Sequence, residues 1–250
     1  MSGILDGKFA LVTGSSNGLG SAIVNELAAA GAVGAGIDIE PGVGELPEGW
    51  ADIRGNVANE SDIEAAMAVI SDKADRLDIV VANAGIVPPW SESANVDLDE
   101  WDHVFAVNVR GVMATIKHSV PLMKRDGGSI VVMGSLNSHR AHGKQCLYTA
   151  TKHAVLGIVR ATALDLGRYG IRVNALGPGP IATDALLGRL EARAKQGEPR
   201  ADEVLKQFAS DAALGRMATE KDVARAAMFL ASHLASGMTG QILPVDAGLA

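Results

Sequence analysis

Several features that mark other classes of protein are missing from this sequence. It has one cysteine, Cys146, which excludes an intramolecular disulfide and favours a reducing compartment. No apolar run approaches about 18 residues without a charge, so no membrane-spanning helix is expected. The net charge is −7 and no basic tract could neutralise phosphates, so a nucleic-acid partner is not expected either. Residues 1–7 do not resemble a signal peptide, and we therefore expect a soluble, cytoplasmic protein.

What the sequence contains is a regular alternation of strand and helix patterns. Its 250 residues suit one α/β domain, and no linker or internal repeat divides them. The expected strands are 8–12, 33–37, 52–57, 78–82, 129–133, 173–176 and 241–245. The expected helices include 101–123, 148–167 and 223–234. This alternation predicts an α/β fold with one Rossmann-type doubly wound parallel sheet, covered by helices on both faces.

Two local signals complete this organisation. Ser61 and Glu64 match a capping box, which predicts a helix start at that point. Residues 184–213 are charged and rich in alanine, with little to tie them to a core. We interpret this segment as helices of a mobile lid over a substrate site, with a surface helical hairpin as the alternative.

A glycine-rich turn follows the first strand and leads into a helix. Gly14, Gly18 and Gly20 follow Thr13 with the spacing TGxxxGxG. Glycines let backbone N–H groups approach a pyrophosphate, which also favours the positive end of the following helix. Because strand, turn and helix come in this order, the pattern favours dinucleotide binding over a merely tight turn.

An acidic residue at the end of the second strand indicates which dinucleotide binds. Asp38 follows Gly18 at the roughly twenty-residue offset of a carboxylate that accepts the ribose hydroxyls of adenosine. Its charge would repel a 2′-phosphate. No arginine or lysine follows closely, and Asn17 stands in the turn where a basic residue could contact such a phosphate. The sequence therefore favours NAD over NADP, and no metal site is expected.

A tyrosine and a lysine four residues apart provide the candidate chemistry. Tyr148 and Lys152 lie in a helical pattern, so they share one face, and Ser135 comes thirteen residues before the tyrosine. A phenol titrates near ~10, but a nearby ammonium favours its ionised form and lowers that pKa. The pair can then work as a general acid or base. Cys146 lies close by, but nothing indicates how it would be activated, so we interpret it as a buried or pocket-edge residue.

Together these motifs resemble the short-chain dehydrogenase/reductase family, in its compact branch of about 250 residues. The resemblance covers essentially the whole chain and follows the family's order. The motifs are Thr13-Gly14 to Gly20, Asn83-Ala84-Gly85, Asn108, Ser135, Tyr148, Lys152 and Gly177-Pro178-Gly179 to Thr183. Such proteins transfer hydride between a nicotinamide cofactor and an alcohol or ketone. The resemblance also implies a homotetramer in which the long helices pair across two-fold axes.

The resemblance implies a role for each matching residue. Tyr148 would be the acid/base, Ser135 would hold the substrate oxygen, and Lys152 would lower the tyrosine pKa and bind the nicotinamide ribose. Asn108 would place a water that links Lys152 to solvent. The implied cofactor contacts are Gly14, Ser16, Asn17, Gly18, Leu19, Gly20, Asp38, Asn56, Val57, Asn83, Ala84, Gly85, Tyr148, Lys152, Pro178, Gly179, Ile181 and Thr183.

Two positions depart from the family's pattern. Ala82 replaces the first asparagine of the usual NNAG motif, which removes one stabilising side chain beside the sheet. Asn56 replaces an aspartate that meets the adenine amine, and its amide oxygen can still accept that hydrogen bond. Neither departure touches the expected catalytic groups.

The sequence leaves the substrate and one alternative function open. The expected substrate pocket consists of Trp90, Asn137, His139, His142, Gln145, Leu186 and Leu187. This mixture suits a polyol or sugar, or a cyclic or aryl alcohol. A non-catalytic protein that senses NAD on the same fold is the alternative, although a sensor has no need of four catalytic groups. Enoyl reduction is disfavoured, because that variant separates its tyrosine and lysine by more residues.

Overall fold

The fold is a seven-stranded parallel sheet, seen in a computed structural model that describes residues 3–40 and 46–249. Within these residues the strand order is β3-β2-β1-β4-β5-β6-β7, and every neighbouring pair is parallel. The strands are β1 Phe9–Thr13, β2 Val33–Asp38, β3 Trp50–Arg54, β4 Ile79–Ala82, β5 Gly128–Met133, β6 Ile171–Pro178 and β7 Ile242–Val245. The predicted doubly wound sheet is confirmed. The strand order reverses between β1 and β4, where such sheets bind ligands.

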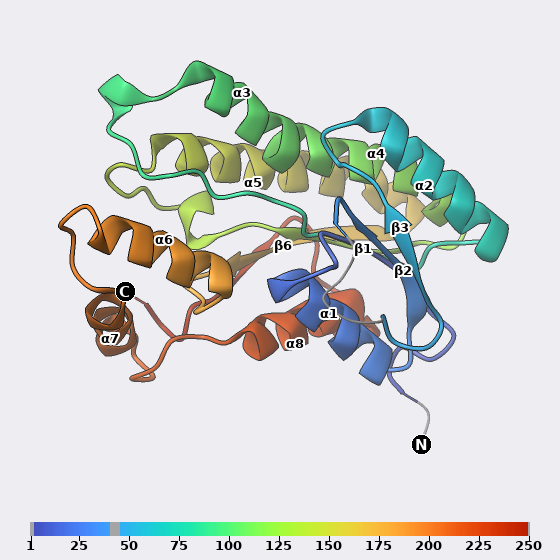
Figure 1. The fold of residues 1–250 in the computed structure, drawn as a ribbon. Coiled ribbons are helices and arrows are strands. Elements are labelled where there is room, and N and C mark those ends of the chain that lie inside the picture. Colours follow the sequence, from blue (N-terminus) through green and yellow to red (C-terminus); the bar gives the residue numbers. More distant parts are fainter. Residues whose placement is uncertain (1–2, 41–45, 250) are drawn as a thin grey trace.

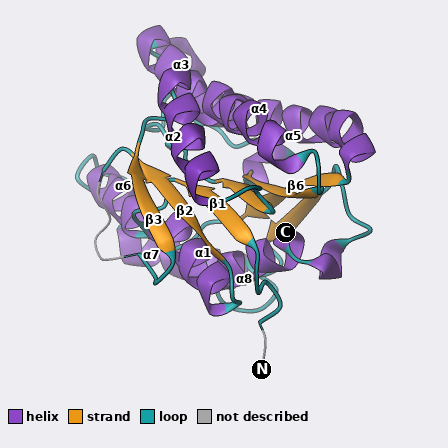
Figure 2. Cartoon of the chain, turned by 90° about the vertical axis from the view of Figure 1, so that its right-hand side faces the viewer, coloured by secondary structure: helices purple, strands orange, loops and turns teal. Residues whose placement is uncertain are grey.

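Helices cover both faces of the sheet (Figure 2). One layer contains α2 Glu60–Lys73, α3 Leu98–Phe105, α4 Gly111–Met123 and α5 Cys146–Leu166. The other contains α1 Gly18–Ala29 and α8 Glu220–Ala231. Two separate apolar clusters fill the spaces between sheet and helices. Every residue of β4 is buried, as expected for a central parallel strand covered on both faces.

The long helix predicted over 101–123 contains an irregular turn. Its first part is α3, a π-helical turn spans Ala106–Arg110, and α4 completes it. The helix begins earlier than expected because the Asp97 carboxylate accepts hydrogen bonds from the N–H groups of Asp99 and Glu100. Asn108 lies inside the π-helical turn and is 1% exposed. Such turns occur often at functional sites.

Two predicted boundaries are wrong, and each has a local cause. The capping box at Ser61 does not form, because α2 already begins at Glu60 and has no side-chain cap. The third strand begins at Trp50, not at residue 52. The indole Nε1 of Trp50 donates a hydrogen bond of 3.1 Å to the Ala32 carbonyl and fixes the strand beside β2.

The segment at 184–213 forms two helices, α6 Asp184–Ala194 and α7 Ala201–Asp211. Figure 1 shows them beside the loops that leave the carboxyl ends of the strands. Leu190 of α6 is buried, and α6 packs against α7 within the segment. Its mobility stays a prediction. In the described part of the chain, none of the helices has the length and hydropathy needed to span a membrane.

Candidate active site

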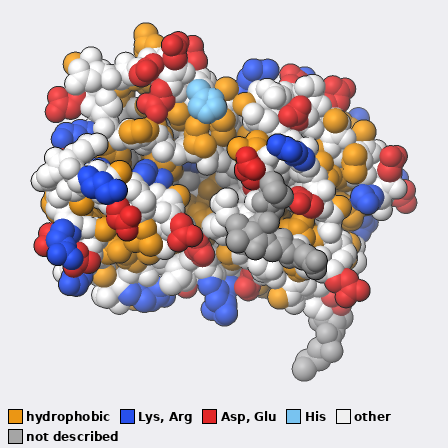
Figure 3. All heavy atoms as spheres, in the orientation of Figure 1, with side chains coloured by type: hydrophobic (Ala, Val, Ile, Leu, Met, Phe, Trp, Pro, Cys, Tyr) orange, Lys and Arg blue, Asp and Glu red, His pale blue; other side chains and the backbone are white. Residues whose placement is uncertain are grey.

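The candidate site lies at the carboxyl edge of the sheet, where the loops after β1, β4, β5 and β6 meet. Figure 3 shows a hollow on this side of the molecule, bordered by hydrophobic and basic side chains. Parallel strands all direct their carboxyl ends to one edge, so motifs far apart in sequence come together here.

The glycine turn after β1 has the geometry that a phosphate group requires. Gly14 and Gly18 have φ angles of +66° and +49°, in the left-handed region that favours glycine. A Cβ atom on Gly20 would lie 1.7 Å from the Gly14 carbonyl oxygen, so no side chain fits there. The turn therefore brings bare backbone to the N-terminus of α1. This arrangement fits the pyrophosphate of a dinucleotide.

Two polar side chains hold that turn against the end of β4. The Asn83 Nδ2 atom donates hydrogen bonds of 3.0 Å to the carbonyls of Thr13 and Gly14. The Thr13 hydroxyl accepts bonds of 3.1 Å from the N–H groups of Asn83 and Ala84. Asn83 was predicted beside the adenosine ribose, but its side-chain nitrogen is engaged by the turn. The sequence reasoning missed this role of Thr13.

Asp38 lies at the same edge, fixed by backbone donors. One carboxylate oxygen accepts a 2.9 Å hydrogen bond from the Ser16 N–H, and the other accepts a 2.7 Å bond from the Ile39 N–H. The strand register places Arg54 beside Asp38, and Arg54 is exposed. The sequence-based preference for NAD rests on the residues that follow Asp38 closely and on Asn17 in the glycine turn, and Arg54 lies outside both.

A shallow groove continues from Asp38 across the end of β3. It is lined by Ile39, Ile53, Arg54, Gly55, Asn56, Asp62, Ala65, Ala66 and Val69. The Asn56 Oδ1 atom, predicted to accept from the adenine amine, already accepts a 2.9 Å bond from the Ala58 N–H. The Asn56 N–H donates to the Asp62 carboxylate at 3.0 Å. Val57 is buried and packs close to Gly111.

Three of the four expected catalytic residues come from the turn after β5 and from α5. Ser135 follows β5 and begins a short 3-10 turn, and its hydroxyl accepts a 3.2 Å bond from the Asn137 N–H. Tyr148 and Lys152 lie one turn apart near the start of α5. The Lys152 ammonium is 5.6 Å from the centre of the Tyr148 ring and donates a 2.8 Å bond to the Met133 carbonyl.

Burial determines the protonation of this group. Burial raises the pKa of Tyr148, whereas the hydrogen bond with Ser135 and the positive charge of Arg189 lower it. Burial lowers the pKa of Lys152 to about 8. The expectation that Lys152 lowers the Tyr148 pKa is not met in this structure, since the ammonium is directed to the Met133 carbonyl. The shift from an ordinary phenol is upward, not downward as the sequence predicted.

Asn108 connects the loop after β4 to the helix of the tyrosine. Its Oδ1 atom accepts a 2.8 Å bond from the Ile86 N–H, and its Nδ2 atom donates a 2.8 Å bond to the Ile86 carbonyl. The same Nδ2 atom lies 3.4 Å from the Thr151 hydroxyl, which donates to the Tyr148 carbonyl. The predicted water relay through Asn108 stays a prediction.

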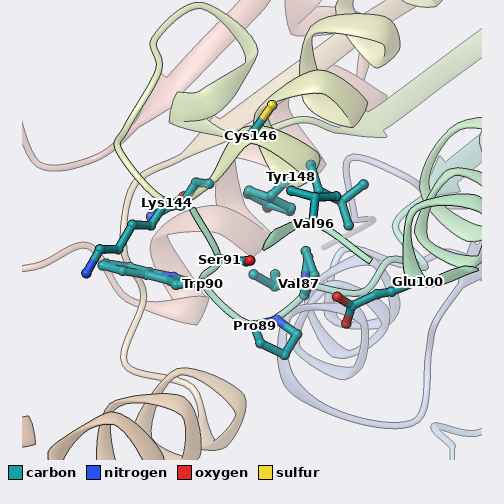
Figure 4. Close-up of a pocket in the computed structure, with 12 residues that line it drawn as sticks. Val87, Pro89, Trp90, Ser91, Val96, Glu100, Lys144, Cys146 and Tyr148 are labelled. Carbon is teal, nitrogen blue, oxygen red and sulfur yellow. The ribbon is translucent and has the colours of Figure 1, made fainter. Parts of the chain in front are cut away.

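A cavity opens directly beside Tyr148 (Figure 4). Its lining comes from the loop after β4 and from the start of α5. The lining residues are Val87, Pro88, Pro89, Trp90, Ser91, Val96, Glu100, Lys144, Gln145, Cys146, Leu147 and Tyr148. Cys146 is exposed at the edge, and Figure 4 shows its sulfur directed away from the labelled cavity residues.

Two of the seven predicted substrate residues, Trp90 and Gln145, line this cavity, and the others lie elsewhere. Asn137 is buried, and its Nδ2 atom donates to the side-chain oxygens of Gln145 and Thr149 at 2.8 and 3.1 Å. It therefore organises the loop before α5. His139 and His142 are exposed, and Leu186 and Leu187 lie half-buried on α6.

The strap after β6 leads from the nicotinamide side of the predicted site into α6. Pro178 ends β6, Gly179 follows it, and Ile181 is buried. The Thr183 hydroxyl, expected to meet the carboxamide, accepts a 3.2 Å bond from the Leu186 N–H and caps α6. The predicted cofactor residues Pro178, Gly179, Ile181 and Thr183 thus lie between the sheet edge and α6.

Known proteins resemble this chain over nearly its whole length. A family profile described as enoyl-(acyl carrier protein) reductase matches residues 14–250. The (+)-borneol dehydrogenase 2 of Salvia officinalis is 37% identical over 252 residues, which cover 97% of this chain and 89% of that protein. Short-chain dehydrogenase reductase 3c of Arabidopsis thaliana is 34% identical over 257 residues, 99% of this chain and 96% of the relative.

Solved structures agree. The ligand-free aldohexose dehydrogenase of Thermoplasma acidophilum superposes with a TM-score of 0.92 and 28% identity, over 100% of this chain and 96% of that one. A carveol dehydrogenase from Mycobacterium avium in complex with NAD gives a TM-score of 0.90 and 29% identity, over 98% of both chains.

The burial of Lys152 predicts a pH-dependent effect on stability. Below about pH 8 the buried ammonium is charged in the folded protein and costs free energy of folding. Between about pH 8 and 10.5 the unfolded chain still binds a proton that the folded protein has released, so the cost declines. Cofactor-free Lys152→Met should therefore be more stable than the parent at pH 7, by up to about 3 kcal/mol, and this gap should shrink by about pH 10.

Urea unfolding of both proteins at the two pH values measures this gap. Lys195→Met is the matched control, because Lys195 is exposed on the same chain and should show no such pH dependence. A gap for Lys152→Met that stays the same at both pH values would contradict the assignment of a buried, titrating ammonium.

Proposed function

Because the chain belongs to the short-chain dehydrogenase/reductase family, a family of oxidoreductases, we propose that it transfers hydride between NAD(H) and a secondary alcohol or ketone. The observation that carries this proposal is that Ser135 and Lys152 flank Tyr148, which lines a cavity at the sheet edge that also holds the glycine turn. A nicotinamide ring, when bound, accepts or supplies the hydride.

The side chains of this group each have a part in the proton transfer. In alcohol oxidation, Tyr148 takes the hydroxyl proton while Ser135 holds the substrate oxygen by a hydrogen bond. In ketone reduction Tyr148 returns that proton to the same oxygen. The Lys152 ammonium lies 5.6 Å from the centre of the Tyr148 ring, and its positive charge favours the phenolate during alcohol oxidation.

Enoyl reduction is the second candidate, since the matching family profile carries that description. Three residues separate Tyr148 from Lys152, fewer than in the enoyl-reducing variant of the family, and this spacing favours alcohols and ketones. Assays with NADH and either a ketone or a trans-2-enoyl thioester distinguish ketone reduction from enoyl reduction. We expect NADH to be oxidised with ketones and not with the thioester. A non-catalytic NAD sensor would give neither reaction.

Tyr148→Phe tests the proposed acid/base directly. The substitution removes the hydroxyl and leaves the ring, so turnover of any accepted alcohol should fall by at least about 10²–10⁴-fold while NAD still binds. Stopped-flow absorbance of reduced nicotinamide measures the rate. Tyr169→Phe is the matched control, because Tyr169 is the second of the two tyrosines and lies at the far end of α5, near Arg168. A Tyr148→Phe rate within threefold of the parent would exclude Tyr148 as the base.

Cofactor choice should depend on Asp38. Like charges brought together cost several kcal/mol, so we expect the parent kcat/KM with NAD to exceed that with NADP by about 100-fold or more. Asp38→Ala should raise kcat/KM with NADP and so narrow the preference for NAD, because the neighbouring Arg54 can then attract the 2′-phosphate. Adding Arg54→Gln should remove part of this increase with NADP. Steady-state kinetics with both cofactors provide the values. Equal or better efficiency of the parent with NADP would overturn the assignment.

We also propose that the protein is a cytoplasmic homotetramer. Large apolar side chains remain exposed on the outer helices, such as Leu164 of α5, which is 85% exposed, and Met113 of α4, at 40%. Symmetric pairing of these helices would bury them. Light scattering at micromolar concentration should give about four times the chain mass of 25.8 kDa, and a monomer would rule the proposal out.

A further inference from the structure

One face of α6 lies near the candidate active site and carries two arginines. Arg189 and Arg193 are four residues apart, so they lie one above the other on the same face of the helix. The Arg193 guanidinium lies 3.7 Å from the centre of the Trp90 ring, and Trp90 is part of the cavity wall. This contact places the arginine-bearing face of α6 against Trp90, a residue of the cavity wall.

The two arginines differ in how their charges are neutralised. Arg193 forms an ion pair of 3.3 Å with Glu198 in addition to its contact with Trp90. Arg189 is half-buried, yet it makes no ion pair and no side-chain hydrogen bond within residues 3–40 and 46–249. A guanidinium that is partly removed from water is costly unless an anion or hydrogen-bond acceptor compensates it.

Arg189 lies one helical turn closer than Arg193 to Thr183, where α6 leaves the sheet edge. It also lies within electrostatic reach of the candidate acid/base. The charge of Arg189 lowers the pKa of Tyr148, and the phenolate in turn raises the pKa of Arg189, although burial lowers the latter more strongly. The charge of Arg189 therefore acts on the hydroxyl that would exchange a proton with the substrate.

We propose that Arg189 binds a carboxylate of the substrate, so that the preferred substrate is a hydroxy acid or the corresponding keto acid. This inference rests on the proposed function and specifies the substrate class of the same site. A guanidinium presents two parallel N–H donors that match the two oxygens of a carboxylate. A carboxylate held there would fix the substrate relative to Ser135 and Tyr148 and would neutralise the half-buried charge.

The cofactor's pyrophosphate is the other anion expected in this region, and it has a separate place. The glycine turn between β1 and α1 fits it, on the opposite side of the switch point from α6. Removing Arg189 should therefore leave NAD affinity unchanged. A clear loss of NAD affinity in Arg189→Gln, measured without substrate, would instead assign the arginine to the cofactor.

Matched pairs of ketones test the inference without requiring turnover. Acetoacetate is compared with acetoacetamide, and 4-acetylbenzoate with 4-acetylbenzamide, by calorimetric titration into full-length protein saturated with NAD. A charge-assisted, bidentate contact predicts that at least one acid binds the parent about 10- to 100-fold more tightly than its amide. Arg189→Gln should abolish this difference, and Arg189→Lys should retain part of it.

Lys195→Gln is the charge-matched control. It removes one positive charge beside the C-terminal end of the same helix, at an exposed position, and should leave the preference for the acid intact. The inference is overturned if no acid binds the parent more tightly than its amide, or if the preference survives in Arg189→Gln. The affinities of acid and amide are compared in the parent protein itself. The absence of a preference for the acid would therefore be seen even if Arg189→Gln failed to fold.

Kinetics separate this inference from the proposed function. If an acid is turned over, Arg189→Gln should raise its KM about 10- to 100-fold while kcat stays within about threefold. If no compound is turned over but the acids still bind through Arg189, the proposed function fails, and Arg189 is a carboxylate-binding residue without a substrate role. If neutral alcohols are oxidised and no acid is preferred, the proposed function stands and the inference fails.

Discussion

The structure depends on the hydrogen bonds with which Asn83 joins the two halves of the sheet. Its side chain donates a hydrogen bond to the Gly14 carbonyl, which ties the loop after β4 to the glycine turn after β1. The same loop is held again three residues later, where the Asn108 side chain accepts a hydrogen bond from the Ile86 N–H and donates one to the Ile86 carbonyl. Asn108 in turn approaches Thr151, one residue before Lys152. A continuous series of polar contacts thus runs from the first strand to the helix of the acid/base.

This series of contacts positions a charged group that burial alone would disfavour. Lys152 is 5% exposed, and its ammonium is held by the Met133 carbonyl at the end of β5. Tyr148 is half-buried, and the partial loss of water around its hydroxyl raises its pKa above that of a free phenol. The positive charge of Arg189 offsets part of the upward shift in the pKa of Tyr148. The site is therefore tuned by groups from α5 and α6, two elements joined through the sheet edge.

The sequence carries much of this fold and part of the site. Apolar runs separated by helical patterns are sufficient to predict the parallel sheet, and the spacing of Tyr148 and Lys152 predicts that they share a face. The upward pKa shift of Tyr148 could not be predicted, because it depends on how deeply the ring is buried and where the ammonium points. Nor could the positions of Arg54 beside Asp38 and of Arg189 within electrostatic reach of Tyr148, since each depends on how elements distant in sequence are arranged.

The central claim is that this edge of the sheet carries out hydride transfer, and isotope labelling tests it most directly. A set of secondary alcohols, hydroxy acids included, is prepared with deuterium on the carbinol carbon and incubated with the protein and NAD. Mass spectrometry of the cofactor follows the label. The account predicts that reduced NAD forms and carries one deuterium from the alcohol. Reduced NAD without deuterium, or no reduced NAD with any alcohol in the set, would contradict it.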